Sequence, residues 1–229
     1  MQLKSDYTWF VRIGLILIGA AGFIFAIGDA MIPQEFGMFS ATEDPKGFAE
    51  LVTLEGFRFW TLRGIIGAPL ETIGTIALFF GLIGSPKETW AFWGMLLAVL
   101  ADLFGTGMFM IMYYVFPHVG EVILEGNRAV ASVASLEGFM PIVGFMFLGT
   151  VIGLIFLAVA IWQSDRFPKW SGVVVVIGFL ALLIQTSYVV QILGNVVWGA
   201  GYFWMAVYSW NRLPWGKEDE GTLSGSIST

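Results

Sequence analysis

Two acidic side chains, Glu71 and Asp102, lie deep inside apolar stretches of the sequence, where carboxyl groups are rare. Glu71 precedes Pro86 by 15 residues, and Asp102 follows Lys87 by 15 residues. Because hairpin partners equidistant from a short turn lie at similar depth, we expect the two carboxyls within ~10 Å of one another near the middle of a membrane. An ionised acid at that depth costs ~2.5–3.5 kcal/mol or more, so each should face a bundle interior or a wet cavity rather than lipid.

The chemistry open to this pair depends on its protons. Two neighbouring carboxylates repel one another, so such a pair holds a single proton near neutral pH. That arrangement suits proton coupling or the binding of a cationic group. The alternative is that both groups are protonated structural acids, hydrogen-bonded to Thr72, Thr75 or Thr106.

Three further charges stand near the ends of these apolar stretches: Arg58, Arg63 and Asp29. Helical side chains lean toward the N-terminus of their helix, so Arg63 should extend to the nearby membrane surface as an anchor and not toward Glu71. Alternatively, Arg58 and Arg63 form the positive floor of an outward pocket for an anionic headgroup. Asp29 is the natural salt-bridge candidate for either arginine.

A possible metal site is the pattern His-x-x-Glu-x-x-x-Glu at His118, Glu121 and Glu125, which places three ligand types on one helical face. The solvated face of an amphipathic loop helix has the same spacing. The chain has no Cys and one His, which excludes thiolate catalysis, Cys-ligated zinc and a bis-histidine haem within one chain. We expect no cofactor, and no GxSxG, Walker or HExxH motif indicates an enzyme.

The composition is that of a membrane protein. Hydrophobic residues make up 57% of the 229 residues, charged residues only 12%, and the mean hydropathy is +0.81. Soluble domains carry about 25% charged residues. The net charge of −6 argues against a nucleic-acid partner. The lipid bilayer is the expected surrounding.

Apolar stretches of about 20 residues, the length needed to cross a membrane, predict an all-α bundle. Its six expected transmembrane helices cover residues 10–31, 59–83, 90–115, 140–162, 170–189 and 192–211. They form one domain, residues 1–211. Residues 212–229 are a polar, Gly- and Ser-rich tail that we expect to be disordered and cytoplasmic.

A short sequence repeat suggests that the bundle contains parallel hairpin repeats. Leu54-Glu55-Gly56-Phe57 returns 82 residues later as Leu136-Glu137-Gly138-Phe139, and Pro86-Lys87 meets Pro168-Lys169 at the same offset. The alternative is that both copies are helix-end signals, since Thr53 and Ser135 suit N-caps and a following Glu suits a first helical turn. Both interpretations remain open.

Glycines recur at helical spacing in two of the expected helices. They form a GxxxG pattern at Gly149 and Gly153, and a stripe at Gly64, Gly67, Gly74 and Gly81. Such patterns indicate close packing within the bundle or, alternatively, a homodimer interface.

Two stretches, "GAPLETIGTIALFFGL" and "RFPKWSGVVVVIG", give the chain a layout that loosely resembles bacterial six-helix integral membrane proteins grouped as domains of unknown function. The resemblance covers most of the chain and implies a six-helix membrane fold. Such families have no assigned catalytic residues, so it implies no residue roles.

Three functional hypotheses follow. In the first, the protein binds or translocates a small solute, lipid or ion through a polar cleft around Glu71 and Asp102. In the second, it is a non-catalytic accessory or assembly subunit, with its acidic loops and Gly-rich helices holding a membrane protein partner. A metal-dependent membrane enzyme using the His118 pattern is the third.

The distribution of loop charges predicts a multi-pass topology in the cell membrane with both termini cytoplasmic. Assigning both termini and the turns near residues 86 and 168 to one side places seven cations there, against three on the other. Reporter fusions should therefore place residues 86 and 168 and the C-terminus in the cytoplasm, with residues 45 and 125 outside. An odd number of crossings, or an exported C-terminus, would contradict the charge argument.

Overall fold

The computed structural model describes residues 5–32, 41–134, 140–184 and 187–212, and these contain helices but no strand. In chain order the elements are α1 (Ser5–Ala30), α2 (Pro45–Val52), α3 (Glu55–Leu82), α4 (Glu88–Tyr114), α5 (Phe116–Leu124), the 3-10 helix η2 (Arg128–Ala134), α6 (Met140–Gln163), α7 (Lys169–Leu182) and α8 (Tyr188–Arg212). The all-α expectation is confirmed.

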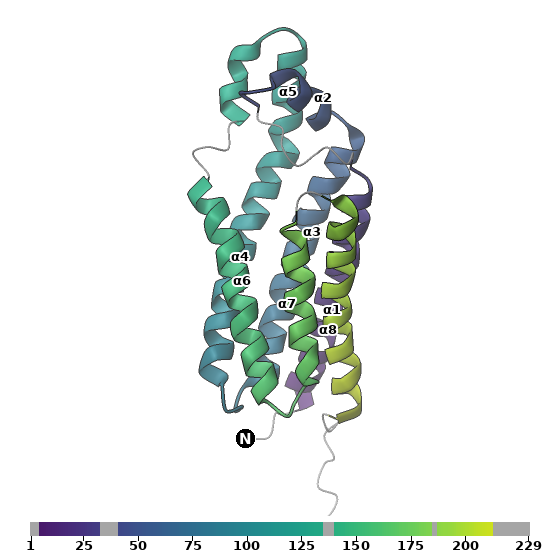
Figure 1. The fold of residues 1–229 in the computed structure, drawn as a ribbon, viewed down its shortest axis with the longest axis vertical. Helices are drawn as coiled ribbons and strands as arrows, with labels where there is room; N and C mark the ends of the chain where they lie inside the picture. Colours follow the sequence, from purple (N-terminus) through teal and green to yellow (C-terminus); the bar gives the residue numbers. More distant parts are fainter. Residues whose placement is uncertain (1–4, 33–40, 135–139, 185–186, 213–229) are drawn as a thin grey trace, which may run out of the picture.

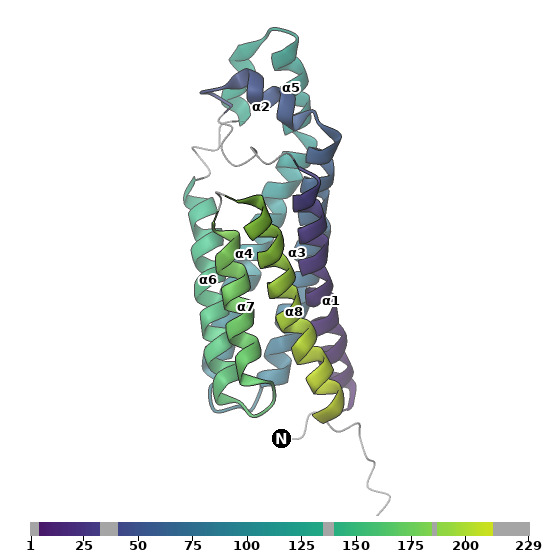
Figure 2. The ribbon, with the colours of Figure 1, turned by 45° about the vertical axis from the view of Figure 1, so that its right-hand side comes forward.

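Helices α1, α3, α4, α6, α7 and α8 run along the long axis of the molecule and pack as a closed ring (Figures 1 and 2). Each ring helix packs against the ring helices before and after it in the chain, and the last, α8, packs against the first, α1. Five of these helices are long and apolar enough to cross a membrane. The exception is α7, which has 14 residues and ends at Leu182, so the crossing expected at residues 170–189 is not confirmed.

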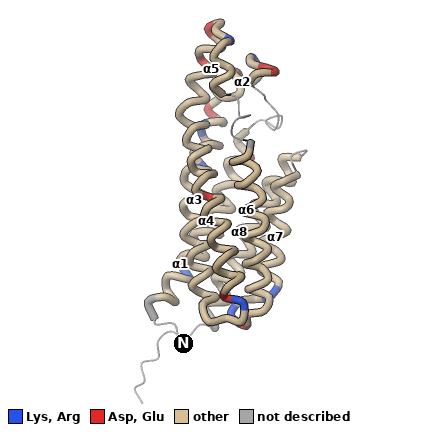
Figure 3. The backbone as a smooth tube through the Cα atoms, turned by 90° about the vertical axis from the view of Figure 1, so that its left-hand side faces the viewer, with Lys and Arg blue, Asp and Glu red and all other residues tan. Residues whose placement is uncertain are grey.

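The two ends of the bundle differ. The start of α1, the end of α8 and the turns at residues 83–87 and 164–168 lie together at one end, here named the turn end (Figure 1). At the other end, α2, α5 and η2 form a small cap with its own apolar core, which includes Phe48, Phe57 and Phe116. Lys, Arg, Asp and Glu gather mainly at these two ends (Figure 3).

Two arginines at the turn end are fixed to helix C-termini. Arg12 donates to the main-chain carbonyl of Ser209, near the end of α8, at 3.1 Å. Arg166 donates to the carbonyl of Gly81, near the end of α3, also at 3.1 Å. These cations satisfy terminal carbonyls and oppose the negative ends of the helix dipoles. They therefore tie the turns and termini to the bundle.

The cap continues directly from the bundle because α4 passes into α5 with only Val115 between them. The break precedes Pro117, which has no N–H to continue the helical ladder. The expected third crossing, residues 90–115, therefore lies within a longer apolar segment that runs from Glu88 to Leu124.

Glycines bring several helix backbones into direct contact. Between α4 and α6, a Cβ on Gly153 would lie 2.8 Å from the carbonyl oxygen of Gly94. Between α1 and α8, a Cβ on Gly22 would lie 2.8 Å from the Cα of Gly199. Close backbone approach at small residues is the usual way that membrane helices associate. The Gly149–Gly153 pattern therefore serves packing within the bundle at Gly153.

The hairpin repeat is not confirmed. The second copy of the repeated tetrapeptide, residues 136–139, lies outside the described residues. The first arms, α3 and α6, are both long helices followed by a short turn. The second arms diverge, because α4 is unbroken at residues 101–105, whereas the equivalent residues 183–187 separate α7 from α8.

Gly153→Leu should lower the free energy of unfolding by about 1–3 kcal/mol, the usual cost of overpacking, because the nearest atoms are backbone atoms of α4. Gly144→Leu is the matched control on the same helix, since no atom lies within 4 Å of a Cβ there. Thermal unfolding in detergent would measure both. Equal loss in the two variants would show that α4 and α6 do not depend on this contact.

Candidate functional site

A cavity of about 410 Å³ lies inside the ring, and all six ring helices contribute to its wall. Asp29, near the end of α1, and Trp60, near the start of α3, lie toward the cap, whereas Glu71 and Asp102 lie near the middle of their helices. The cavity thus extends from mid-bundle toward the cap. Toward the turn end, apolar side chains such as Leu15, Leu78, Leu157, Ile161 and Met205 form a packed core.

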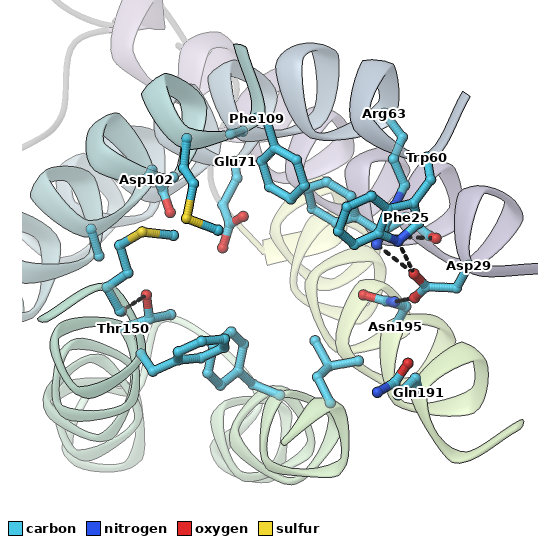
Figure 4. Close-up of a pocket in the computed structure, with 18 of the residues that line it drawn as sticks. Phe25, Asp29, Trp60, Arg63, Glu71, Asp102, Phe109, Thr150, Gln191 and Asn195 are labelled. Carbon is cyan, nitrogen blue, oxygen red and sulfur yellow. Dashed lines mark hydrogen bonds and ion pairs between the residues drawn. The ribbon is translucent and has the colours of Figure 1, made fainter. Parts of the chain in front are cut away.

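Glu71 on α3 and Asp102 on α4 both line this cavity, and Figure 4 shows their carboxyl groups directed into it. Asp102 is buried, with 7% of its surface exposed, and one of its carboxyl oxygens accepts a hydrogen bond from the Thr72 hydroxyl at 3.2 Å. Thr106 instead donates to the main-chain carbonyl of Asp102, at 2.8 Å. The helical hairpin therefore brings the two acids to one cavity, as their equal distances from the turn predict.

The two carboxyls differ in their partners. Among the described residues, none donates a hydrogen bond to Glu71 and none forms an ion pair with it. The threonine-bonded alternative thus describes one oxygen of Asp102 and does not describe Glu71. Within the described wall, the only cation is Arg63, which is engaged elsewhere.

Asp29 is the centre of a second polar cluster at the cap side of the cavity (Figure 4). Its carboxylate forms an ion pair with Arg63 of α3. The same carboxylate accepts hydrogen bonds from the indole N–H of Trp60 at 3.0 Å and from the amide of Asn195 on α8 at 2.6 Å. Arg63 also donates to the carbonyl of Phe25 at 3.1 Å. Its guanidinium lies over the rings of Phe25 and Trp60.

The anchor expected at Arg63 is therefore wrong. Its side chain is only 12% exposed and points to Asp29 rather than to a membrane surface. The buried carboxylate of Asp29 keeps the guanidinium inside the bundle as its ion-pair partner. Arg58 does not join Arg63, because it is exposed and lines a separate hollow with Glu55 and Tyr113. The expected two-arginine pocket is not assembled.

The possible metal site at His118, Glu121 and Glu125 is not assembled among the described residues. His118 and Glu121 approach to 3.3 Å on the exposed face of α5. No group of three His, Cys, Asp or Glu side chains among the described residues could hold a metal ion. The pattern is the solvated face of a cap helix, which was the alternative explanation for it.

Asn195 and Gln191 are wall residues that sequence reasoning missed. Neither was a candidate site residue in the sequence analysis: Gln191 precedes the expected helix 192–211 and Asn195 lies inside it, and the structure places both within α8, where they line the cavity. Their spacing of four residues was the available signal, because polar side chains at i and i+4 in an apolar helix share one face. The aromatic part of the wall, including Phe109 and Phe179, had no signal that distinguished it from lipid-facing residues.

Removing one partner of the Asp29–Arg63 pair should be costly. Arg63→Met should lower the free energy of unfolding by about 3–5 kcal/mol, because it leaves a buried carboxylate without its cation. Arg58→Met, an exposed arginine on the same helix, should change it by within about 0.5 kcal/mol. The double variant Asp29→Asn/Arg63→Met should lose less than the sum of the single variants, since no unpaired charge remains. Additive losses in unfolding experiments would mean that the two residues act independently.

No family model, curated protein or solved structure matches this chain.

Proposed function

We propose that this chain is an integral membrane protein that binds or translocates a small solute or ion in the ring cavity, with Glu71 and Asp102 as binding groups. The observation that carries the proposal is a cavity walled by six apolar helices and containing two carboxyls without a cationic partner. Five helices of membrane-spanning length place this cavity in a protein suited to a bilayer.

The energetic cost of these carboxyls supports a functional role. Acidic side chains within membrane helices are unfavourable and are usually found where they face a pathway, a ligand or one another. Asp29 is compensated by Arg63, Trp60 and Asn195. No described residue compensates Glu71 in this way. A ligand or a hydrated cavity is the remaining source of stabilisation.

The short α7 supports a hydrated cavity. Leu182, at its end, and Tyr188, at the start of α8, both line the cavity. The described residues between the two helices, Leu183, Ile184 and Ser187, are not helical. In Figure 2, α4 continues well beyond the level at which α7 ends. Non-helical backbone at membrane depth is tolerated where protein or a water-filled cavity satisfies its polar groups. We propose that α7 belongs to the fifth of six crossings, that its end lies beside such a water-filled cavity, and that the turn end is cytoplasmic.

A second candidate function is that of an accessory subunit. The cap exposes Tyr114, Leu124 and Val133, which are 72%, 50% and 64% exposed. Apolar side chains on a membrane protein's cap suit contact with a partner protein. The cavity favours the first function, because a scaffold does not need an open space containing acidic groups.

Filling the cavity tests the binding function directly. Gly105 lines the cavity, and a Cβ there would meet only the end of the flexible Met146 side chain. Gly105→Phe should therefore occupy the cavity. Gly107→Phe is the matched control two residues away, since Gly107 is exposed and has no atom within 4 Å of its added Cβ. Native mass spectrometry, with elemental analysis for ions, should detect a ligand on the wild type and on Gly107→Phe that Gly105→Phe lacks.

Two results would count against cavity binding. A ligand retained fully by Gly105→Phe would lie elsewhere on the protein. A second protein chain recovered equally with all three forms, without any small ligand, would favour the accessory-subunit function.

A further inference from the structure

The charges in the cavity wall are unequally compensated. Four described wall residues are acids or bases that can carry a charge near neutral pH: Asp29, Arg63, Glu71 and Asp102. The first two form an ion pair, and their charges cancel. The other two face the cavity with one threonine hydroxyl as their hydrogen-bond donor. A positively charged ligand is therefore favoured over an anion, because the only cation in the wall is already neutralised.

The ligand's expected charge follows from the proximity of the carboxyls. Two acids that face one cavity repel one another when both ionise, so we expect the pair to carry one negative charge and one proton when a cation binds. A monocation would balance this charge. A dication would need both acids to lose their protons.

The oxygen atoms of the wall do not suit a hard metal cation. Calcium takes six to eight oxygen ligands, and magnesium needs near-ideal octahedral geometry. Besides the four oxygens of its two carboxyls, the described mid-cavity wall offers one hydroxyl, that of Thr150, so its side chains fall short of the six oxygens that calcium needs. A volume of about 410 Å³ is far larger than one ion needs and falls within the range of pockets for organic ligands.

The rest of the wall is aromatic and apolar. Phe109, Phe147, Phe179 and Tyr188 line the cavity in addition to Phe25 and Trp60, whose faces are occupied by Arg63. Aromatic faces attract organic cations, with a gain of about 0.5–2 kcal/mol per favourable contact. Such walls also bury the apolar body of a ligand.

We propose that the ligand of the cavity is an organic monocation with an apolar body, such as a substituted ammonium or phosphonium ion. Its charge lies at Glu71 and Asp102, and its apolar groups lie against Phe109, Phe147, Phe179 and Tyr188. This inference rests on the proposed binding function and adds the chemical class of the ligand.

The test uses the full chain in lipid nanodiscs with radiolabelled tetraphenylphosphonium as the probe and empty nanodiscs as background. Saturable binding is expected for the wild type, with affinity at least tenfold lower in Glu71→Gln. Glu125→Gln, the same substitution at an exposed cap residue, should bind as the wild type does. Phe109→Leu should bind more weakly while keeping both carboxyls. Tetraphenylborate, which has the same shape and the opposite charge, should show no saturable binding.

The outcomes separate this inference from the proposed function. If the borate binds as well as the phosphonium, and Glu71→Gln changes neither, the cavity takes apolar solutes without regard to charge and the cation inference is wrong. Loss of that binding in Gly105→Phe would still uphold cavity binding.

Phosphonium binding that survives Gly105→Phe would overturn the inference by placing the probe outside the cavity. Displacement of the phosphonium by millimolar Na⁺ or Ca²⁺ would overturn it in favour of an inorganic ion. If Glu71→Gln unfolds at a lower temperature than Glu125→Gln, its loss of binding could reflect instability. Asp102→Asn then takes its place, and we expect the same tenfold loss of phosphonium affinity.

Discussion

The ion pair between Asp29 and Arg63 is the interaction on which the candidate site depends. It joins α1 to α3, and the hydrogen bond from Asn195 adds α8, so three helices meet at one carboxylate. Because a buried carboxylate is stable only when it is paired and hydrogen-bonded, these helices must turn the same faces toward one another. Gly28 permits the arrangement, since a Cβ there would collide with the Arg63 side chain. The cap side of the cavity takes its shape from this cluster.

The cavity itself results from uneven packing along the ring. Glycine contacts hold helix backbones close together, as at Gly22 and Gly199, and large apolar side chains fill the turn end. Toward the cap, α7 ends at Leu182 while α4 continues to Tyr114. The ring stays closed, but one of its helices no longer supplies side chains at that level. The resulting space is lined by groups from all six helices, which is the usual construction of a ligand site within a helix bundle.

The two polar clusters then have different physical roles. Around Asp29 every charge has a partner, so the cluster stabilises one arrangement of α1, α3 and α8. At Glu71 and Asp102, a single threonine donor faces two carboxyls. In a low-dielectric interior, the attraction between the paired charges at the first cluster is strong. For the same reason, the cost of the unpaired carboxyls at the second cluster is high. The Asp29–Arg63 cluster therefore acts as a rigid frame. Beside it, Glu71 and Asp102 would be stabilised by binding a cation.

The amino-acid sequence by itself determined the helical class, the approximate positions of the long helices and the shared cavity of Glu71 and Asp102. These depend on local apolar periodicity and on counting residues from a turn, which both act along one chain segment. The tertiary structure was needed to show that Arg63 rather than Arg58 pairs with Asp29, that Asn195 donates to the same carboxylate, and that His118 belongs to no metal-ligand group among the described residues. The length of α7 was decided there too. The side-chain pairings depend on how each helix is rotated against its neighbours. Glycine contacts and buried charges set that rotation, and they join segments as far apart as residues 29 and 195.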